Sequence, residues 1–157
     1  MKIKILIILF FGLANFGFGQ NLNMIIDIND KLLTNYVGDA YLTFENNIGS
    51  KDKIKVGYLP GELILNEIAW NKIKSEETTK IIFSFTYFTW KKENQESVNF
   101  EINMNKYHFN KDYLILHIYD FRERKYRRKY SCLTDKNYIY DFNFPQGGIL
   151  VTCGKGW

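Results

Sequence analysis

Alternation between apolar and polar residues predicts β-strands along most of this chain. The strictest case is VNFEINM at Val98–Met104, in which every second side chain is apolar and those between are Asn or Glu. Such a pattern is typical of a strand with one buried and one solvent-exposed face. A longer alternating run, Ile81–Trp90, precedes it, and the polar segment KKENQES lies between the two. We therefore expect these runs to form an antiparallel hairpin.

Further strand candidates lie on both sides of this hairpin. YLILHIYDF at Tyr113–Phe121 is apolar on both faces, which predicts a strand in the middle of a sheet. Beyond it, the spacing of Tyr126, Tyr130 and Cys132 predicts another strand. Arg128 interrupts its inward-facing set, which a bulge or an edge position would accommodate. The remaining candidates are Met24–Ile28, Tyr41–Glu45, Ile54–Leu59, Glu62–Ile68, Tyr138–Phe144 and Ile149–Cys153.

One segment, Asn66–Lys74, fits a short helix as an alternative, because Ile68, Ala69 and Ile73 have loose helical spacing. About eight short strands joined by turns predict an all-β fold, an antiparallel β-sandwich of immunoglobulin-like or transthyretin-like type. The sequence contains no repeat and no linker-like segment. We therefore expect residues 20–157 to form a single β-sandwich domain.

The first twenty residues, MKIKILIILFFGLANFGFGQ, have the layout of a secretory signal peptide. Lys2 and Lys4 precede the apolar run Ile5–Phe11, and small residues and glycines follow up to Gly19. A membrane-spanning helix needs about 20 predominantly apolar residues, and this run is shorter. We therefore expect a signal peptide at 1–19, cleaved close to Gln20, and a mature chain with no membrane span. An uncleaved N-terminal anchor is the alternative.

Removal of such a peptide changes the charge balance. The whole chain has 21 basic and 17 acidic residues, a formal net charge of +4, and two of the basic residues are Lys2 and Lys4. The mature chain therefore carries +2, which gives no general argument for a polyanionic partner, and we do not expect nucleic acid. Only a local concentration of basic residues would support an anionic ligand.

Cys132 and Cys153 are the two cysteines of the chain. In an exported protein such a pair predicts a disulfide, because thiols outside the cytosol are exposed to oxidation. The bond would close a loop of about 21 residues and contribute about 3 kcal/mol in the chain-entropy model. Both cysteines fall at core-facing positions of their predicted strands, which supports the pairing. A nucleophilic thiol with a histidine as its base is the alternative.

The sequence RERKYRRK at 122–129 holds six basic residues and one acidic residue in eight positions. Guanidinium groups match the geometry of phosphate oxygens, and aromatic rings can stack on sugars. The run is therefore a candidate site for an anionic glycan or lipopolysaccharide. The alternative is a solvated hairpin whose charges deter edge-to-edge pairing of strands. The candidate ligand-binding residues are Arg122, Arg124, Lys125, Tyr126, Arg127, Arg128 and Lys129.

Signals for metal binding and catalysis are weak. The two histidines, His108 and His117, are separated by mostly extended chain, so we expect no metal site and no cofactor. The sequence has no serine in a glycine elbow, no HExxH pair and no phosphate-binding glycine loop. The absence of these motifs favours a non-catalytic protein.

Together these features favour an exported, non-catalytic binding module in the periplasm, at the cell surface or outside the cell. Its expected partner is a protein or an anionic glycan such as lipopolysaccharide. Lectin-like, adhesin-like, and inhibitor or immunity-type roles fit this description. Two alternatives remain: an exported hydrolase whose site combines scattered acids with His108 or His117, and a purely structural envelope component.

Overall fold

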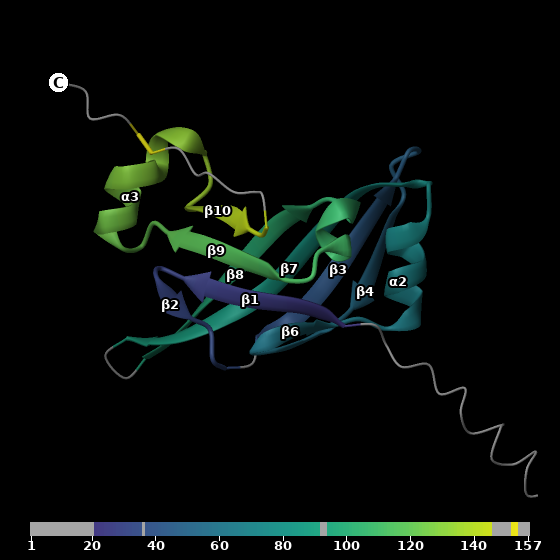
Figure 1. The fold of residues 1–157 in the computed structure, drawn as a ribbon. Coiled ribbons are helices and arrows are strands. Elements are labelled where there is room, and N and C mark those ends of the chain that lie inside the picture. The colour runs from purple at the N-terminus through teal and green to yellow at the C-terminus, as the bar shows by residue number, and fades with distance from the viewer. Residues whose placement is uncertain (1–20, 36, 92–93, 146–151, 154–157) are drawn as a thin grey trace, which may run out of the picture.

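The computed structural model of the chain describes residues 21–35, 37–91, 94–145 and 152–153. They are mostly β-structure, as the sequence predicts, and their strands form two sheets that face each other (Figure 1). The predicted signal peptide at 1–19 lies outside the described residues. Most of the predicted strand Ile149–Cys153 does as well.

The larger sheet has six strands. They are β1 (Leu22–Ile28), β2 (Lys31–Leu32), β5 (Gly57–Leu59), β6 (Gly61–Ile64), β9 (Leu114–Asp120) and β10 (Tyr138–Asn143). Their order is β10-β9-β1-β6-β5, and β2 pairs with β1. All pairs are antiparallel except β1 with β9, which is parallel and corrects the expectation of a wholly antiparallel fold. Strands so far apart in the chain are not joined by a tight turn, and only a tight turn would force them to run antiparallel.

The smaller sheet has the order β4-β3-β7-β8, and all its pairs are antiparallel. Its strands are β3 (Gly38–Asn46), β4 (Lys51–Lys55), β7 (Thr78–Lys91) and β8 (Asn94–Met104). The predicted β7–β8 hairpin is confirmed and is longer than expected, since pairing continues to Lys91 and Asn94. Most of the segment expected as a polar turn is therefore strand. The more specific immunoglobulin-like or transthyretin-like type stays a prediction.

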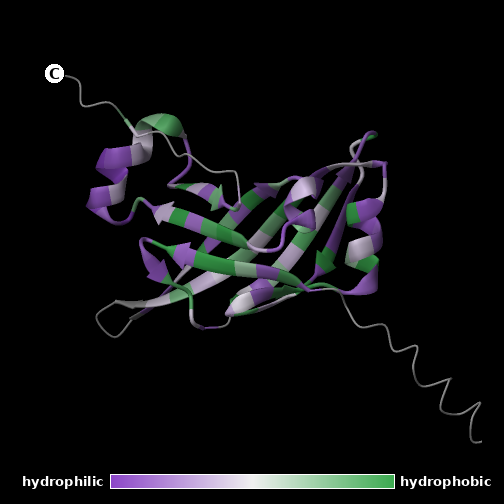
Figure 2. Ribbon diagram, in the orientation of Figure 1, coloured by the Kyte–Doolittle hydropathy of each residue, from purple (hydrophilic) through white to green (hydrophobic). Residues whose placement is uncertain are grey.

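The main apolar core of the described residues lies between the two sheets and contains side chains of both. The alternation of apolar and polar residues that creates it is visible along the strands in Figure 2. Each fully buried large apolar side chain contributes about 1.5–3 kcal/mol relative to an exposed one. The buried face predicted for Val98–Met104 is confirmed by Phe100, Ile102 and Met104. The same alternation buries Ile81, Phe83 and Phe85 in β7 and Leu114, Leu116 and Ile118 in β9.

Helix α2 (Glu67–Lys74) lies at one end of the molecule (Figure 1). The Asn66 side chain caps it by accepting a hydrogen bond from the Ala69 N–H at 2.8 Å. Ala69, Trp70 and Ile73 are buried at helical spacing, so the helical alternative for this segment is confirmed. The other helical elements are η1 (Lys106–Asn110), α3 (Arg124–Tyr130) and η2 (Ser131–Leu133).

Tyrosine hydroxyls join the two sheets along the outer edge of β8. The Tyr138 hydroxyl, from β10, accepts a hydrogen bond from the Glu101 N–H at 2.8 Å and donates one to the Glu101 carbonyl at 2.9 Å. Two residues further along each strand, the Tyr140 hydroxyl accepts a hydrogen bond from the Asn103 N–H at 2.9 Å. Backbone groups that would face solvent at a sheet edge are thus paired by side chains of the other sheet.

A Tyr138→Phe substitution should lower the free energy of unfolding by about 1–2 kcal/mol, because it removes both hydrogen bonds to Glu101 while keeping the ring. Tyr113→Phe is the matched control, since Tyr113 is 45% exposed, and it should change stability by less than about 0.5 kcal/mol. Urea denaturation of both variants measures the difference. Equal stability of the two variants would contradict a structural role for the Tyr138 hydroxyl.

Candidate functional site

Most of the predicted basic run is helical, which corrects the expectation of a hairpin and an edge strand. Tyr126 and Tyr130 are four residues apart, a spacing that puts them on one face of a strand and also on one face of a helix. Arg128 lies between them and distinguishes the two cases, because it would point inward in a strand and points away from both tyrosines in a helix. In α3 both tyrosines are buried and Arg128 is exposed.

The tyrosines of α3 pack on a small apolar cluster outside the main core. The ring of Tyr119, in β9, lies with its centroid 4.7 Å from that of Tyr130 and 5.4 Å from that of Tyr126. Burial, followed by the neighbouring Tyr130, raises the pKa of Tyr119 to about 12, so this residue stays protonated at physiological pH. Phe121 is buried beside them. The inward face of α3 is therefore uncharged and tightly packed.

The turn between β1 and β2 holds the start of α3. Asn29 and Asp30 both adopt left-handed backbone angles, with φ of 56° and 61°, as two-residue hairpin turns of type I′ require. The Asp30 carboxylate accepts a hydrogen bond from the Tyr126 hydroxyl at 2.5 Å and one from the Lys125 ammonium at 3.1 Å. These two bonds, chiefly the first, lower the pKa of Asp30. Asp30 was not predicted as a site residue, although Asn-Asp directly after an apolar strand is a turn signal.

The predicted disulfide between Cys132 and Cys153 is confirmed, with the Cα atoms 5.9 Å apart. It joins η2, directly after α3, to the C-terminal part of the chain. The Cys153 N–H also donates a hydrogen bond to the Lys129 carbonyl at 2.9 Å, at the end of α3 where carbonyls lack a helical partner. Cys132 is exposed, so the expectation that it faces the core is wrong. The bond fastens α3 at its C-terminal end.

The seven predicted binding residues fall into two groups. Four are engaged within the protein. The Tyr126 side chain is buried and Lys125 pairs with Asp30. Arg122 pairs with Asp120 at 2.6 Å and with Glu96 at 3.4 Å, and the Arg127 Nε donates a hydrogen bond to the Phe121 carbonyl at 3.0 Å.

The second group points outward. Arg124, Arg128 and Lys129 are exposed, and among the described residues none of them has a carboxylate partner. The Lys129 ammonium lies 4.9 Å from the centre of the Tyr130 ring. We call these three residues the cationic face of α3. It lies at the end of the molecule opposite to α2 (Figure 1).

A groove of about 650 Å³ lies between the edge of β8 and the start of α3. Its walls combine residues of β8 with the segment around Phe121, and it contains two of the predicted binding residues, Arg122 and Arg127. Lys136 was not predicted; its ammonium donates hydrogen bonds to the Glu101 carbonyl at 3.4 Å and to the Tyr138 hydroxyl at 3.2 Å. The other lining residues are Val98, Asn99, Asp120, Asp135 and Asn137.

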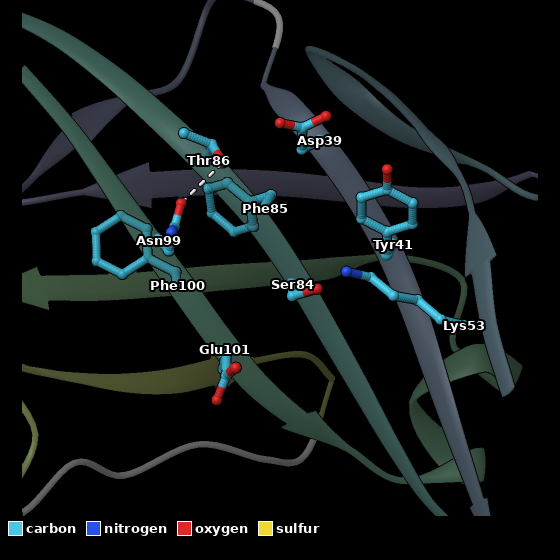
Figure 3. Close-up of a pocket in the computed structure, with 9 residues that line it drawn as sticks. All are labelled: Asp39, Tyr41, Lys53, Ser84, Phe85, Thr86, Asn99, Phe100 and Glu101. Carbon is cyan, nitrogen blue, oxygen red and sulfur yellow. Dashed lines mark hydrogen bonds between the residues drawn. The ribbon is translucent and has the colours of Figure 1, made fainter. Parts of the chain in front are cut away.

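A second hollow, of about 390 Å³, opens on the outer face of the smaller sheet (Figure 3). Asp39 adopts a left-handed φ of 46° next to a register shift in β3, and such irregularities redirect side chains. The Lys53 ammonium lies 4.1 Å from the centre of the Tyr41 ring and covers one face of it. This hollow is lined mainly by polar groups. Its other lining residues are Ser84, Phe85, Thr86, Asn99, Phe100 and Glu101.

The histidines do not converge. His108 is buried, and its Nδ1 accepts a hydrogen bond from the Asn105 N–H at 3.1 Å, which is a structural role in η1. His117 lies on the outer face of the larger sheet, with its Nδ1 3.8 Å from an Asp27 oxygen that makes no hydrogen bond within the described residues. Neither hollow described above includes His117, so this pair lacks an adjacent substrate pocket there.

Within the described ranges, no group of three or more His, Cys, Asp or Glu side chains has the arrangement of a metal site. No helix in the same part of the chain is long and apolar enough to cross a membrane. Comparison with family models, curated proteins and solved structures found no match.

Removing the disulfide should loosen α3 more than the sheets. A Cys132→Ser, Cys153→Ser double variant should lose about 3 kcal/mol of stability, since the loop it opens spans 21 residues. Amide hydrogen exchange should speed up in α3 before it does in β7 and β8. Uniform acceleration across both regions would contradict a local fastening role for this bond.

His108 should make the protein sensitive to mild acid. Burial, with a smaller effect of the Lys111 charge, lowers the pKa of His108 from 6.5 to about 4. Its neutral form is therefore favoured by folding, and the resulting stability is complete above pH 6.5 and is lost as the pH falls towards 4. The loss should reach about 3 kcal/mol. A His108→Asn variant, compared with wild type by denaturation at pH 7 and pH 4.5, should lose less; equal losses would contradict this assignment.

Proposed function

We propose that this protein is an exported, non-catalytic binding module that contacts an anionic glycan through the cationic face of α3. The observation that carries the proposal is the division of charge around this helix. Lys125 and Arg122 are neutralised by acidic partners, while Arg124, Arg128 and Lys129 are exposed without such partners among the described residues. Unpaired cations held on a fixed helix favour an external anion.

Three contacts hold α3 in place. Its inward face is packed on Tyr119, its start is held by Asp30, and its end is fastened through Cys153. A helix fixed at three points loses little conformational entropy when it binds, which favours affinity. Surface arginines on a mobile loop would not have this advantage.

The spacing of the cations suits a chain of repeated anionic groups. Arg124 and Arg128 are one helical turn apart on the same side of α3, so their Cβ atoms are separated by about 5–6 Å. Sulfated or phosphorylated sugars, including those of lipopolysaccharide, present anions at neighbouring positions of a chain. The disulfide is compatible with an oxidising compartment outside the cytosol, which is where such glycans occur.

A role as an inhibitor or immunity-type protein is the second candidate. Its support is the same exposed basic helix, since an acidic protein surface presents carboxylates to it in place of sulfates. An immunoglobulin-like or transthyretin-like sandwich, which we propose as the fold type, is compatible with either role. The two candidates are separated by the ligand that the cationic face prefers.

An Arg124→Ala, Arg128→Ala double variant should elute from a heparin column at lower salt than wild type. It should also bind immobilised lipopolysaccharide more weakly, by up to about thirtyfold, since each of the two exposed contacts contributes up to about 1 kcal/mol. The wild-type affinity should fall as salt rises, because exposed charges are screened.

The matched control is a Lys55→Ala, Lys80→Ala double variant. It removes the same charge from exposed positions of the smaller sheet, so it should bind both ligands as wild type does. Equal weakening in the two double variants would indicate attraction by net charge and would overturn the proposed site. No binding by wild type to either ligand would overturn the glycan and leave the protein candidate.

A further inference from the structure

The outer edge of β8 has one part that is paired by side chains and one part that is open. The Glu101 and Asn103 N–H groups donate hydrogen bonds to tyrosine hydroxyls of β10. These N–H groups therefore point away from β7. In an antiparallel strand the backbone groups facing one side recur at every second residue. Asn99 and Ser97 therefore present their N–H and C=O groups at the same edge.

This second part of the edge has no partner within the described residues. Among these residues β8 pairs with β7 alone. None of their backbone or side-chain groups accepts a hydrogen bond from the Ser97 or Asn99 N–H. Both residues are exposed. Unpaired N–H and C=O groups at a strand edge are a template for one more strand.

The groove beside β8 provides space for such a strand. It opens onto Val98 and Asn99 on one side and is bounded on the other by Phe121 and Arg127, and its volume is about 650 Å³. A neighbouring strand lies about 4.8 Å away and advances about 3.4 Å per residue. A segment of a few extended residues matches this space, and Tyr138 lies where it would end, because its hydroxyl already pairs with Glu101.

The charges of the groove favour an acidic side chain in the added strand. Arg122 and Asp120 neutralise each other. Among the described residues, Arg127 and Lys136 bond only to neutral oxygens, those of backbone carbonyls and a tyrosine hydroxyl. Three acidic residues line the groove, and Asp120 is already paired with Arg122. The Glu101 carboxylate lies with the residues of the outer face of the smaller sheet (Figure 3). Asp135 is therefore the one remaining acid of the lining.

We propose that the open edge of β8 at Ser97–Asn99 binds an extended peptide of a partner protein, which adds a strand in the groove and directs an acidic side chain to Arg127. A peptide is favoured over a glycan because a row of alternating donors and acceptors at strand spacing is the complement of a peptide backbone. The site does not include the cationic face of α3, so either proposal can fail without the other.

Panning a phage-displayed library of random twelve-residue peptides on the wild-type protein tests the proposal. Recovered peptides should be rich in β-branched residues and contain Asp or Glu. The tightest of them should slow amide exchange at Ser97 and Asn99, which is fast in the free protein because their N–H groups are unpaired. Protection confined to α3, or to the outer face of the smaller sheet, would overturn the proposal.

An Asn99→Pro variant removes the edge N–H at a position where an edge strand tolerates proline. It should bind the selected peptide at least about tenfold more weakly, with its folding verified by circular dichroism. Asn99→Ala is the matched control, since it keeps the N–H and removes only the side chain that bonds to Thr86, and it should bind as wild type does. Equal binding by Asn99→Pro and Asn99→Ala would overturn strand addition.

Arg127→Ala provides a second test that leaves the strand backbone intact. It should weaken binding of the acidic peptide and leave unchanged the binding of the same peptide with Asn in place of Asp. Sedimentation of the free protein gives a further test: self-association that Asn99→Pro abolishes would show that a second copy occupies the edge, and would overturn the peptide as its partner.

Discussion

The contact between the Tyr138 and Tyr140 hydroxyls and the backbone of β8 determines the shape of the functional end of the molecule. Apolar burial holds the two sheets together, but it does not specify where their edges meet. The hydroxyls do, because each one bonds to a particular N–H group of Glu101 or Asn103. They fix β10 against β8, and the segment that leads from α3 into β10 is positioned with it. Both the groove and the helix above it depend on this alignment.

Helix α3 shows how a short basic segment becomes a defined surface. Seven residues form a marginal helix in isolation. Here distant parts of the chain supply what the segment lacks: the Asp30 carboxylate at one end, Tyr119 beneath it and Cys153 at the other end. Contacts within the protein also divide the basic residues into two groups. Lys125 and Arg127 bond to other parts of the protein, whereas Arg124, Arg128 and Lys129 are left exposed to solvent. A run of like charges that repel each other in the sequence thus becomes a set of cations at fixed positions on one helix.

Local burial patterns explain what the sequence could predict. Phe83 and Phe100 face the core because each strand alternates, and alternation needs no knowledge of the partner strand. The sequence did not reveal that α3 is a helix, because the spacing of Tyr126 and Tyr130 fits both a helix and a strand. Only the position of Arg128 distinguishes the two. The parallel pairing of β1 with β9 and the contact of Asp30 with Tyr126 join residues far apart in the chain, for which a pattern within one segment holds no information.

The two edges of the smaller sheet differ, and this has a consequence for assembly. β4, at one edge, carries Lys51, Lys53 and Lys55, and such lysines disfavour the approach of another strand. β8, at the other edge, has an uncovered stretch. Repeated stacking of copies through the smaller sheet is therefore disfavoured, because each contact between β8 and β4 would meet these lysines. If a strand adds at β8, the smaller sheet gains one strand and still ends at the lysine-carrying β4 on its other side.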